Sequence, residues 1–426
     1  MVTHERVVVT GVGVVSPLAT HAQPHFGRLL LGESGMTVSD RPEYRTFASA
    51  LEARVNDFDR SRMITNRVLR KLLSPSAAYA LTAAGGAVCD AGLEGRSDLL
   101  KRCSLYVGSI AVDIDAEIFI PAFKASLGQQ GDFEISRFAT RGIKLLDPLF
   151  LVKALPNAGL CGISIQHQVL GPNANITNGA VSGLQAVALA AASIWRGQAK
   201  VALAGGYDSL LRMDCVAEHL IAGRLSKRHA EPESACRPFD QERDGYALGE
   251  GAAFVMLEAE SHARARSARV YGEILGVAHT ADPTLIRRPE SDDGRALEHA
   301  ARQALRQAGS GPDDVEVIFG DGLATEVDDL REAGVIKRLV GEAPVPFTAA
   351  TPALGFTGAA SGVFSLVHAL MALARQVVPP LINCRRQDPR CPVYFCDRAQ
   401  EARFRRALVW NSACGQKNVA VFVGSR

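Results

Sequence analysis

Residues 178–195 read NGAVSGLQAVALAAASIW, and this stretch predicts the element around which the fold is built. From Ser182 to Trp195 it carries Ala, Leu and Val on every face of a helical period, and Arg196 and Gly197 follow as an end signal. A helix that is apolar all round is covered on all sides. We therefore expect a helix buried at the centre of the protein.

Short apolar runs before and after this helix predict the strands that cover it. The runs are β-branched or made of small residues, and they alternate with alanine-rich stretches of helical period; they span residues 7–15, 105–110, 201–205, 253–257, 315–319 and 419–423. Such alternation is typical of an α/β layered fold. Residues 295–307 predict a further helix, with a turn at 309–312.

A basic segment at residues 262–269 predicts a helical surface connector between two halves of the chain. We place the boundary near residue 260, which gives an N-terminal half of residues 1–260 and a C-terminal half of residues 261–426. The sequence holds no short repeat or low-complexity tract, so a solenoid is not expected.

Composition and charge argue against several classes of protein. The chain has 426 residues, 47% hydrophobic and 22% charged, which fits a globular protein with a large core. The net charge of +2 gives no global field that would favour nucleic acid or an anionic membrane. Residues 7–15 hold two glycines and are β-branched, so we interpret them as a strand rather than a signal peptide, and no uninterrupted apolar stretch reaches about 18 residues.

The cysteines are scattered and form no CxxC pair. An odd, dispersed set argues against a disulfide framework and against a zinc site. We expect a cytoplasmic protein with no metal and no cofactor; the nine positions are Cys89, Cys103, Cys161, Cys215, Cys236, Cys384, Cys391, Cys396 and Cys414.

Five strings spread over the chain resemble the β-ketoacyl-ACP synthases and occur in that family's order. They are VVVTGVGVVSPL (7–18), GPNANITNGAVSG (171–183), DQERDGYALGEGAA (240–253), GFTGAASG (355–362) and PPLIN (379–383). The resemblance covers essentially the whole chain. It implies a thiolase-like fold of two duplicated αβαβα halves around a buried central helix, usually in a dimer.

The same resemblance implies where catalytic residues would stand. Working members of the family use a cysteine at the N-terminus of the buried helix as nucleophile, and two histidines assist decarboxylation and stabilise the developing anions. With Ser182 and Gly183 as anchor, the cysteine of the family's T-A-C-x-S-G string falls on Ala180. A methyl group cannot carry an acyl thioester.

Asp321 stands where the family places its first histidine. The family string H-G-T-x-T aligns with DGLAT (321–325), and Asp329 and Glu332 follow in register. A carboxylate at this position would repel a developing enolate. Without Asp329 and Glu332, a surface or turn aspartate after the strand at 315–319 would explain Asp321.

The remaining catalytic positions are replaced as well. Phe356 aligns with the second histidine and Thr351 with the lysine of the family's K-x-x-x-G-H string, and neither replacement supplies the missing proton donor. The gating loop G-F-G-G aligns with ACGQ (413–416), which includes Cys414. The framework glycines survive while each catalytic role is lost.

This pattern resembles the chain-length factor of type II polyketide synthases, a non-condensing subunit. The resemblance implies a heterodimer with an active ketosynthase, contact with an acyl carrier protein, and a role in shaping the polyketide tunnel. Chain-length factors usually carry glutamine at the cysteine position. Ala180 departs from that pattern, which favours a reducing or polyene-type system.

Two further sets of residues are assigned from the resemblance. Ile114, Glu117 and Ile118 are candidates for the tunnel floor, and a generic dimer-interface helix explains them equally well. A basic cluster would attract the acidic carrier protein, although a solvated helix face explains it about as well; its members are Arg67, Arg70 and Lys71.

Other interpretations stay open. A free-standing acyltransferase could have recruited Ser182, Cys414 or Asp321 on the same fold. A carrier-binding or small-molecule-binding module without a polyketide role is a third class. Cys161 is interpreted as a buried inert thiol, as is Cys414. The acidic residues around Gly245 could suit a metal ion, but an ion-pair loop is favoured.

Overall fold

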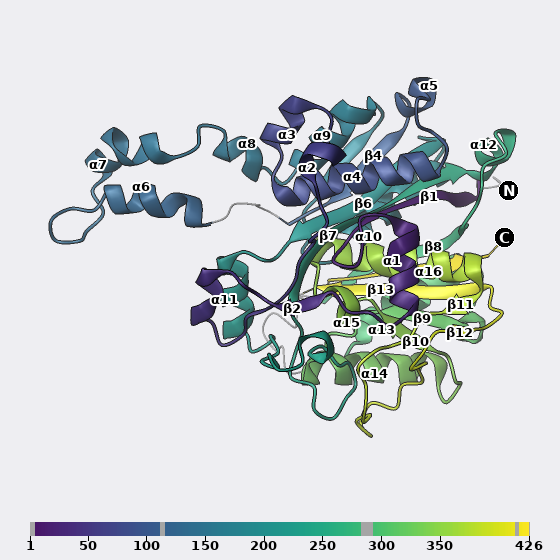
Figure 1. Ribbon diagram of the computed structural model, residues 1–426. Helices are drawn as coiled ribbons and strands as arrows, with labels where there is room; N and C mark the ends of the chain where they lie inside the picture. The colour runs from purple at the N-terminus through teal and green to yellow at the C-terminus, as the bar shows by residue number, and fades with distance from the viewer. Residues whose placement is uncertain (1–4, 111–115, 283–292, 414–416, 426) are drawn as a thin grey trace.

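A single twisted sheet runs through the molecule (Figure 1). The computed structural model describes residues 5–110, 116–282, 293–413 and 417–425 of the chain. The sheet has 12 strands. Ten follow one path, in the order β5 (Asn173–Ile176), β4 (Ser104–Gly108), β6 (Val201–Ser209), β7 (Leu248–Ala259), β1 (Val7–Val15), β8 (Gly272–Ala281), β14 (Lys417–Gly424), β13 (Arg406–Ala413), β9 (Val317–Gly320) and β10 (Phe347–Ala349).

The ten strands of this path form two copies of one five-stranded pattern, and β2 and β3 lie off the path. Numbered by their order in each half of the chain, the strands lie in the order 3-2-4-5-1 in both copies. Pairing along this path also matches: β4 and β9 each lie parallel to both neighbours on it, whereas β7 and β14 each lie antiparallel to both of theirs. The copies meet where Val7 pairs with Ile274. The expected duplication is therefore present, while the division near residue 260 stays a prediction.

Helices form three layers around the two half-sheets (Figure 1). The middle layer contains α10 (Ser182–Trp195) and α16 (Ser361–Arg375), which contact each other. The outer layer on the N-terminal half includes α4 (Pro75–Asp90) and α9 (Ala158–His167), and that on the C-terminal half includes α13 (Arg295–Gln307) and α14 (Glu326–Val340). This αβαβα arrangement confirms the expected fold class.

The central helix lies where its sequence predicts. α10 begins at Ser182 and ends at Trp195, and its Ala, Leu and Val side chains are mostly buried against β4, β6 and α16. Gly183 allows the close approach, because a Cβ there would lie 2.2 Å from the carbonyl oxygen of Ala359. Residues 358–375 are long and apolar enough to cross a membrane, but 83% of this segment is buried inside the protein, as in a core helix.

An arm projects from the N-terminal half between β4 and β5 (Figure 1). It carries three short helices, α6 (Ile120–Ala125), α7 (Ile135–Thr140) and α8 (Phe150–Ala154). Phe133 stacks on Phe123 with ring centroids 5.4 Å apart and contacts Phe138 at 5.9 Å. The arm thus has an aromatic cluster of its own, in which Phe123 and Phe133 stay exposed.

The remaining elements are short. They are α1 (Ala22–Leu30), β2 (Met36–Val38), β3 (Leu51–Ala53), α2 (Arg60–Met63), α3 (Arg67–Leu72), α5 (Ser97–Leu100), α11 (Met213–Ile221), α12 (Glu260–Ala265), α15 (Thr351–Leu354), β11 (Val377–Val378) and β12 (Gln400–Glu401). The helix expected at residues 262–269 is α12, which begins earlier, at Glu260, and ends at Ala265, two residues before Ser267 adopts a positive φ.

Candidate functional site

Ala180 lies buried in the turn that leads into α10. Gly179 before it has a φ of 69°, and the Ser182 hydroxyl closes the turn by donating to the Gly179 carbonyl at 2.6 Å and accepting from the Asn178 amide at 2.7 Å. Backbone N–H groups and the helix dipole would favour an anion here. The side chain at this point is nevertheless a methyl group, and the Ser182 hydroxyl is engaged in holding the turn.

Asp321 follows β9 directly, and its carboxylate points to the end of β13. Oδ1 accepts a hydrogen bond from Nδ2 of Asn411 at 2.6 Å, and Oδ2 accepts one from the Ser412 amide at 3.0 Å. Asp321 is 8% exposed. It is therefore a buried residue of the site and not a surface aspartate.

Glu332 and Asp329 hold the loop that carries Asp321. Glu332 accepts from the amides of Asp321 and Gly322 at 2.9 and 3.0 Å. Asp329 accepts from the Ala324 amide at 3.0 Å. Both carboxylates lie on α14, where they are buried. The structure thus brings together the residues whose spacing singled out this loop.

Burial in this network changes the acidity of Asp321. Burial raises the pKa of its carboxyl to about 7, and the nearby Glu332 carboxylate adds to the rise, while the donors Asn411 and Ser412 oppose it. Burial likewise raises the pKa of Glu332, although the hydrogen bond from Trp410 acts to lower it. Asp321 is therefore partly protonated near neutral pH, and in neither form does it carry positive charge.

Thr351 lies next to Asp321, and Phe356 lies at the other end of the same short segment. Thr351 is the first residue of α15, and its hydroxyl donates to the Asp321 carbonyl oxygen at 2.5 Å. Phe356 contacts the rings of Tyr246 and His219, with centroids 5.2 and 5.8 Å apart. The position aligned with the family's second histidine thus holds a phenyl ring. The position aligned with the lysine holds a hydroxyl that is already hydrogen-bonded to the backbone.

The ends of β13 and α10 meet at the remaining edge of the site. A Cβ on Gly179 would lie 3.5 Å from the Cβ of Ala413, the last residue of β13. Cys414 lies outside the described residues. The site therefore combines the start of α10, the loop after β9, the end of β13 and α15.

Sequence reasoning missed a polar pair beside Phe356. Nδ1 of His219, on α11, lies 2.9 Å from the hydroxyl of Tyr246. Tyr246 belongs to the string DQERDGYALGEGAA, but nothing in the spacing of the sequence links it to His219. Asn411 was also missed, although it stands two residues before the loop string ACGQ.

Cys161 is exposed, which corrects the expectation of a buried thiol. It lies on α9, whose buried residues Gly159, Leu160, Gly162 and Ile163 face the protein, so Cys161 points away from that face. His167, near the end of α9, is partly buried. Neither residue belongs to the site around Ala180.

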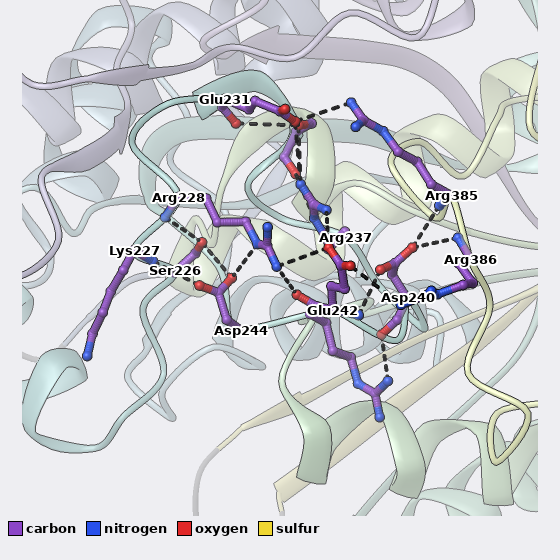
Figure 2. Close-up of polar contacts among 12 residues, drawn as sticks. Ser226, Lys227, Arg228, Glu231, Arg237, Asp240, Glu242, Asp244, Arg385 and Arg386 are labelled. Carbon is purple, nitrogen blue, oxygen red and sulfur yellow. Dashed lines mark hydrogen bonds and ion pairs between the residues drawn. The ribbon is translucent and has the colours of Figure 1, made fainter.

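The acidic loop at residues 240–244 is an ion-pair network (Figure 2). Oδ2 of Asp240 accepts from the amides of Arg385 and Arg386 at 2.8 and 2.7 Å. Arg243, turned inward, contacts Asp388 at 2.8 Å. Asp244 instead accepts from the Ser226 hydroxyl at 2.7 Å, so its carboxylate faces a different partner. Within the described ranges, no group of three or more His, Cys, Asp or Glu could hold a metal ion.

The tunnel and docking candidates stay predictions. Ile114 lies outside the described residues. Glu117 and Ile118 belong to a 3-10 turn (Ala116–Phe119) at the base of the arm, and Ile118 is exposed. A separate helix, α3, carries the basic cluster, and its members Arg67, Arg70 and Lys71 are exposed or partly exposed.

An αβαβα fold built from two copies of one strand pattern, with a site at the start of the buried helix, defines a thiolase-like protein. The β-ketoacyl synthase N-terminal domain model matches residues 4–263, and the C-terminal domain model matches residues 271–385. This chain belongs to the β-ketoacyl synthase family.

Curated relatives of this chain carry the name 3-oxoacyl-[acyl-carrier-protein] synthase 2. The protein from Coxiella burnetii is 30% identical over 395 residues, which cover 92% of this chain and 91% of the relative. That from Mycobacterium bovis is 28% identical, covering 98% and 97%.

Solved structures agree on the fold. The ishigamide ketosynthase/chain length factor has a TM-score of 0.86 at 26% identity, covering 100% of both chains. A β-ketoacyl synthase from Burkholderia phymatum has a TM-score of 0.87 at 23% identity, covering 99% of this chain and 100% of the other. A type II polyketide ketosynthase in complex with its acyl carrier protein has a TM-score of 0.82 at 24% identity, covering 100% of both.

Proposed function

We propose that this chain is a chain-length factor, a non-condensing ketosynthase-like subunit that pairs with an active ketosynthase in type II polyketide biosynthesis. The proposal rests on one observation: the aligned positions lack the side chains of the family's catalytic residues, while the hydrogen bonds that hold the loop after β9 are present. Asp329 and Glu332 still hold the loop after β9, but that loop presents Asp321.

Each catalytic role is lost separately at this site. A methyl group at Ala180 offers no nucleophile. Asp321 is surrounded by hydrogen-bond donors, so its carboxylate is itself the acceptor in the network. The Thr351 hydroxyl donates to a backbone carbonyl, and Phe356 has no polar atom in its side chain. Condensation therefore requires a second subunit with its own cysteine and histidines.

The arm supports pairing with another chain. Among the described residues, 11 of the 19 exposed large hydrophobic side chains lie between residues 118 and 155: Ile118, Ile120, Phe123, Phe133, Ile135, Ile143, Leu145, Leu149, Leu151, Val152 and Leu155. Exposed apolar surface of this extent marks an interaction site. The proposed occupant is the ketosynthase subunit, and the structural relative whose title names a ketosynthase/chain length factor fits this assignment.

Carrier-protein contact is proposed for the basic cluster on α3. Arg67 and Lys71 are exposed there, and a structural relative was solved with an acyl carrier protein. Charge complementarity would speed docking of an acidic carrier. The subunit would belong to a reducing or polyene-type system, since Ala180 replaces the glutamine usual in other chain-length factors.

Intact-protein mass tests the proposal. The purified chain is incubated with acyl- and malonyl-loaded carrier protein, first alone and then with a candidate ketosynthase, while carbon dioxide release is followed. The expected result is an unmodified chain, with condensation only when the partner is present. An acyl adduct or turnover on the isolated chain would instead identify a free-standing acyltransferase.

A further inference from the structure

The central helix α10 keeps one stripe that is only partly buried. Ten of its 14 residues are buried, and the other four lie three or four positions apart, so they share one face: Gln185, Leu189, Ala192 and Trp195. In α16, by contrast, every residue from Gly362 to Leu373 is buried. The two helices of the middle layer therefore differ in how completely they are covered.

The helix that covers α16 is α1, which follows β1 (Figure 1). Phe26 and Leu29 of α1 belong to the same hydrophobic cluster as the core of α16, and His25 contacts His368. In the duplicated pattern, β8 and α10 are the counterparts of β1 and α16. The first described helix after β8 is α13, which lies in the outer layer. Within the described ranges, the place on α10 that corresponds to α1 is therefore empty.

Two adjoining cavities lie at this place, between α10 and β8. The first has a volume of about 330 Å³, and Leu189, Trp195 and Val277 contribute to its walls. The second has a volume of about 260 Å³ and is lined by the start of α10, the end of β8 and the start of β14. Both include His279, so they adjoin there and form one groove along α10.

The charge of this groove has one sign. Arg196 lines the first cavity, at the end of α10, and Lys417 lines the second, near its start. No carboxylate lines either cavity, and among the residues that the structure describes neither cation forms an ion pair. An occupant with an apolar face and flanking carboxylates would complement such a groove.

We propose that the groove between α10 and β8 binds an acidic amphipathic helix of another protein. From Val181 to Arg196 the groove follows α10 over about 22 Å, the length of a helix of about 15 residues. Apolar side chains of the bound helix would fill the cavities, as Phe26 and Leu29 of α1 pack against α16 in the other half. This inference does not rest on the chain-length-factor role.

Tryptophan fluorescence reports on the groove, because Trp195 lines it and the second tryptophan, Trp410, is fully buried. The probe is a synthetic peptide of about 15 residues with Phe and Leu on one helical face and Glu on the other. A matched peptide carries Lys in place of Glu. At low ionic strength the Glu peptide should protect Trp195 of the full-length chain from acrylamide and bind at least about tenfold more tightly than the Lys peptide. Added salt should reduce the difference.

Variants test whether the peptide lies in the groove. Arg196→Glu combined with Lys417→Glu should reverse the preference between the two peptides. Lys337→Glu is the matched control, because Lys337 is exposed on α14 in the outer layer, and it should leave the preference unchanged. Trp195→Phe should remove the fluorescence response while titration calorimetry still detects binding.

Several outcomes would overturn the proposal: no binding of either peptide, equal affinities, or an unchanged preference in the double variant. Shielding of Trp195 in the free monomer would show that the chain itself covers the groove. Shielding that appears only as the chain dimerises, followed by light scattering, would identify a second copy as the occupant and would also overturn it. None of these results bears on the chain-length-factor role, which is decided by partner dependence and the absence of an acyl adduct.

Discussion

The side-chain amide of Asn411 donates a 2.6 Å hydrogen bond to the carboxylate of Asp321, and this contact ties the end of β13 to the loop after β9. Both side chains are buried. Oδ1 of Asn411 has no hydrogen-bond partner within the described part of the chain, so its amide can turn over if the group opposite changes. Hydrogen bonds therefore hold a carboxyl in this position, but burying its negative charge costs free energy.

Asp321→Asn should make the protein more stable at alkaline pH. The folded pKa of Asp321 is about 7 against an ordinary value of 3.8, so the folded state binds the proton more tightly and stability falls as pH rises from about 4 through 7. Above pH 7 the variant should gain roughly 2 to 4 kcal/mol in free energy of unfolding. Urea denaturation at pH 5 and pH 8 measures this. A gain that is equal at both pH values would contradict a raised pKa.

Trp410→Phe should destabilise the fold by about 2 to 4 kcal/mol. The Trp410 indole donates to Oε1 of Glu332 at 2.6 Å and is fully buried, so the variant loses both volume and the donor to a buried carboxylate. Trp195→Phe is the matched control at a partly buried position. Thermal unfolding of the two variants should show the larger loss for Trp410; similar losses would count against the Glu332 network.

Two buried histidines should make the protein sensitive to acid. Nε2 of His25 lies 2.7 Å from Nε2 of His368. Burial lowers the pKa of His25 to about 3 and that of His368 well below its ordinary value, so stability present above pH 6.5 is lost as pH falls toward 3. His368→Gln should reduce the slope of the free energy of unfolding against pH by up to about 1.4 kcal/mol per pH unit. Denaturation between pH 4 and 7 measures it, and an unchanged slope would refute the role of this pair.

Much of the fold could be predicted because the core elements show uniform apolar patterns. The central helix and β1 lie at their predicted bounds. β7 is longer than predicted, since Glu250 is buried in it through hydrogen bonds from Tyr79 and Ser209, which no local pattern reveals. The arm was also missed, because short helices with exposed apolar side chains show no periodic face.

The site was predicted where residues follow one another along the chain. Asp321, Asp329 and Glu332 are linked by their spacing, and the structure joins them in one network. His219 and Tyr246 come from separate elements and meet only through tertiary packing. Sequence spacing therefore predicted the loop that carries Asp321 but could not find the polar residues that lie beside it.

Restoring the nucleophile should not restore condensation. Ala180→Cys would place a thiol at the start of α10, but Phe356 has no polar hydrogen and the Thr351 hydroxyl is engaged with the Asp321 carbonyl oxygen. Each missing acid–base group costs about 10²- to 10⁴-fold in rate. Product formation by the isolated variant should remain at background. Radiolabelled malonyl-carrier assays measure it, and condensation well above background would show that another residue supplies the missing roles.

Charge on the arm should weaken pairing without unfolding the chain. Ile135 is 77% exposed on α7, so Ile135→Asp should change the free energy of unfolding by less than about 0.5 kcal/mol. If the ketosynthase covers the arm, the buried aspartate would be desolvated in the complex and the dissociation constant should rise at least about tenfold. Leu31→Asp is the matched control, because Leu31 is 78% exposed but lies at the end of α1, away from the arm. Light scattering and titration calorimetry with the ketosynthase compare the two variants. Equal affinities would show that the partner does not cover α7, whereas a loss confined to Ile135→Asp would locate the interface on the arm.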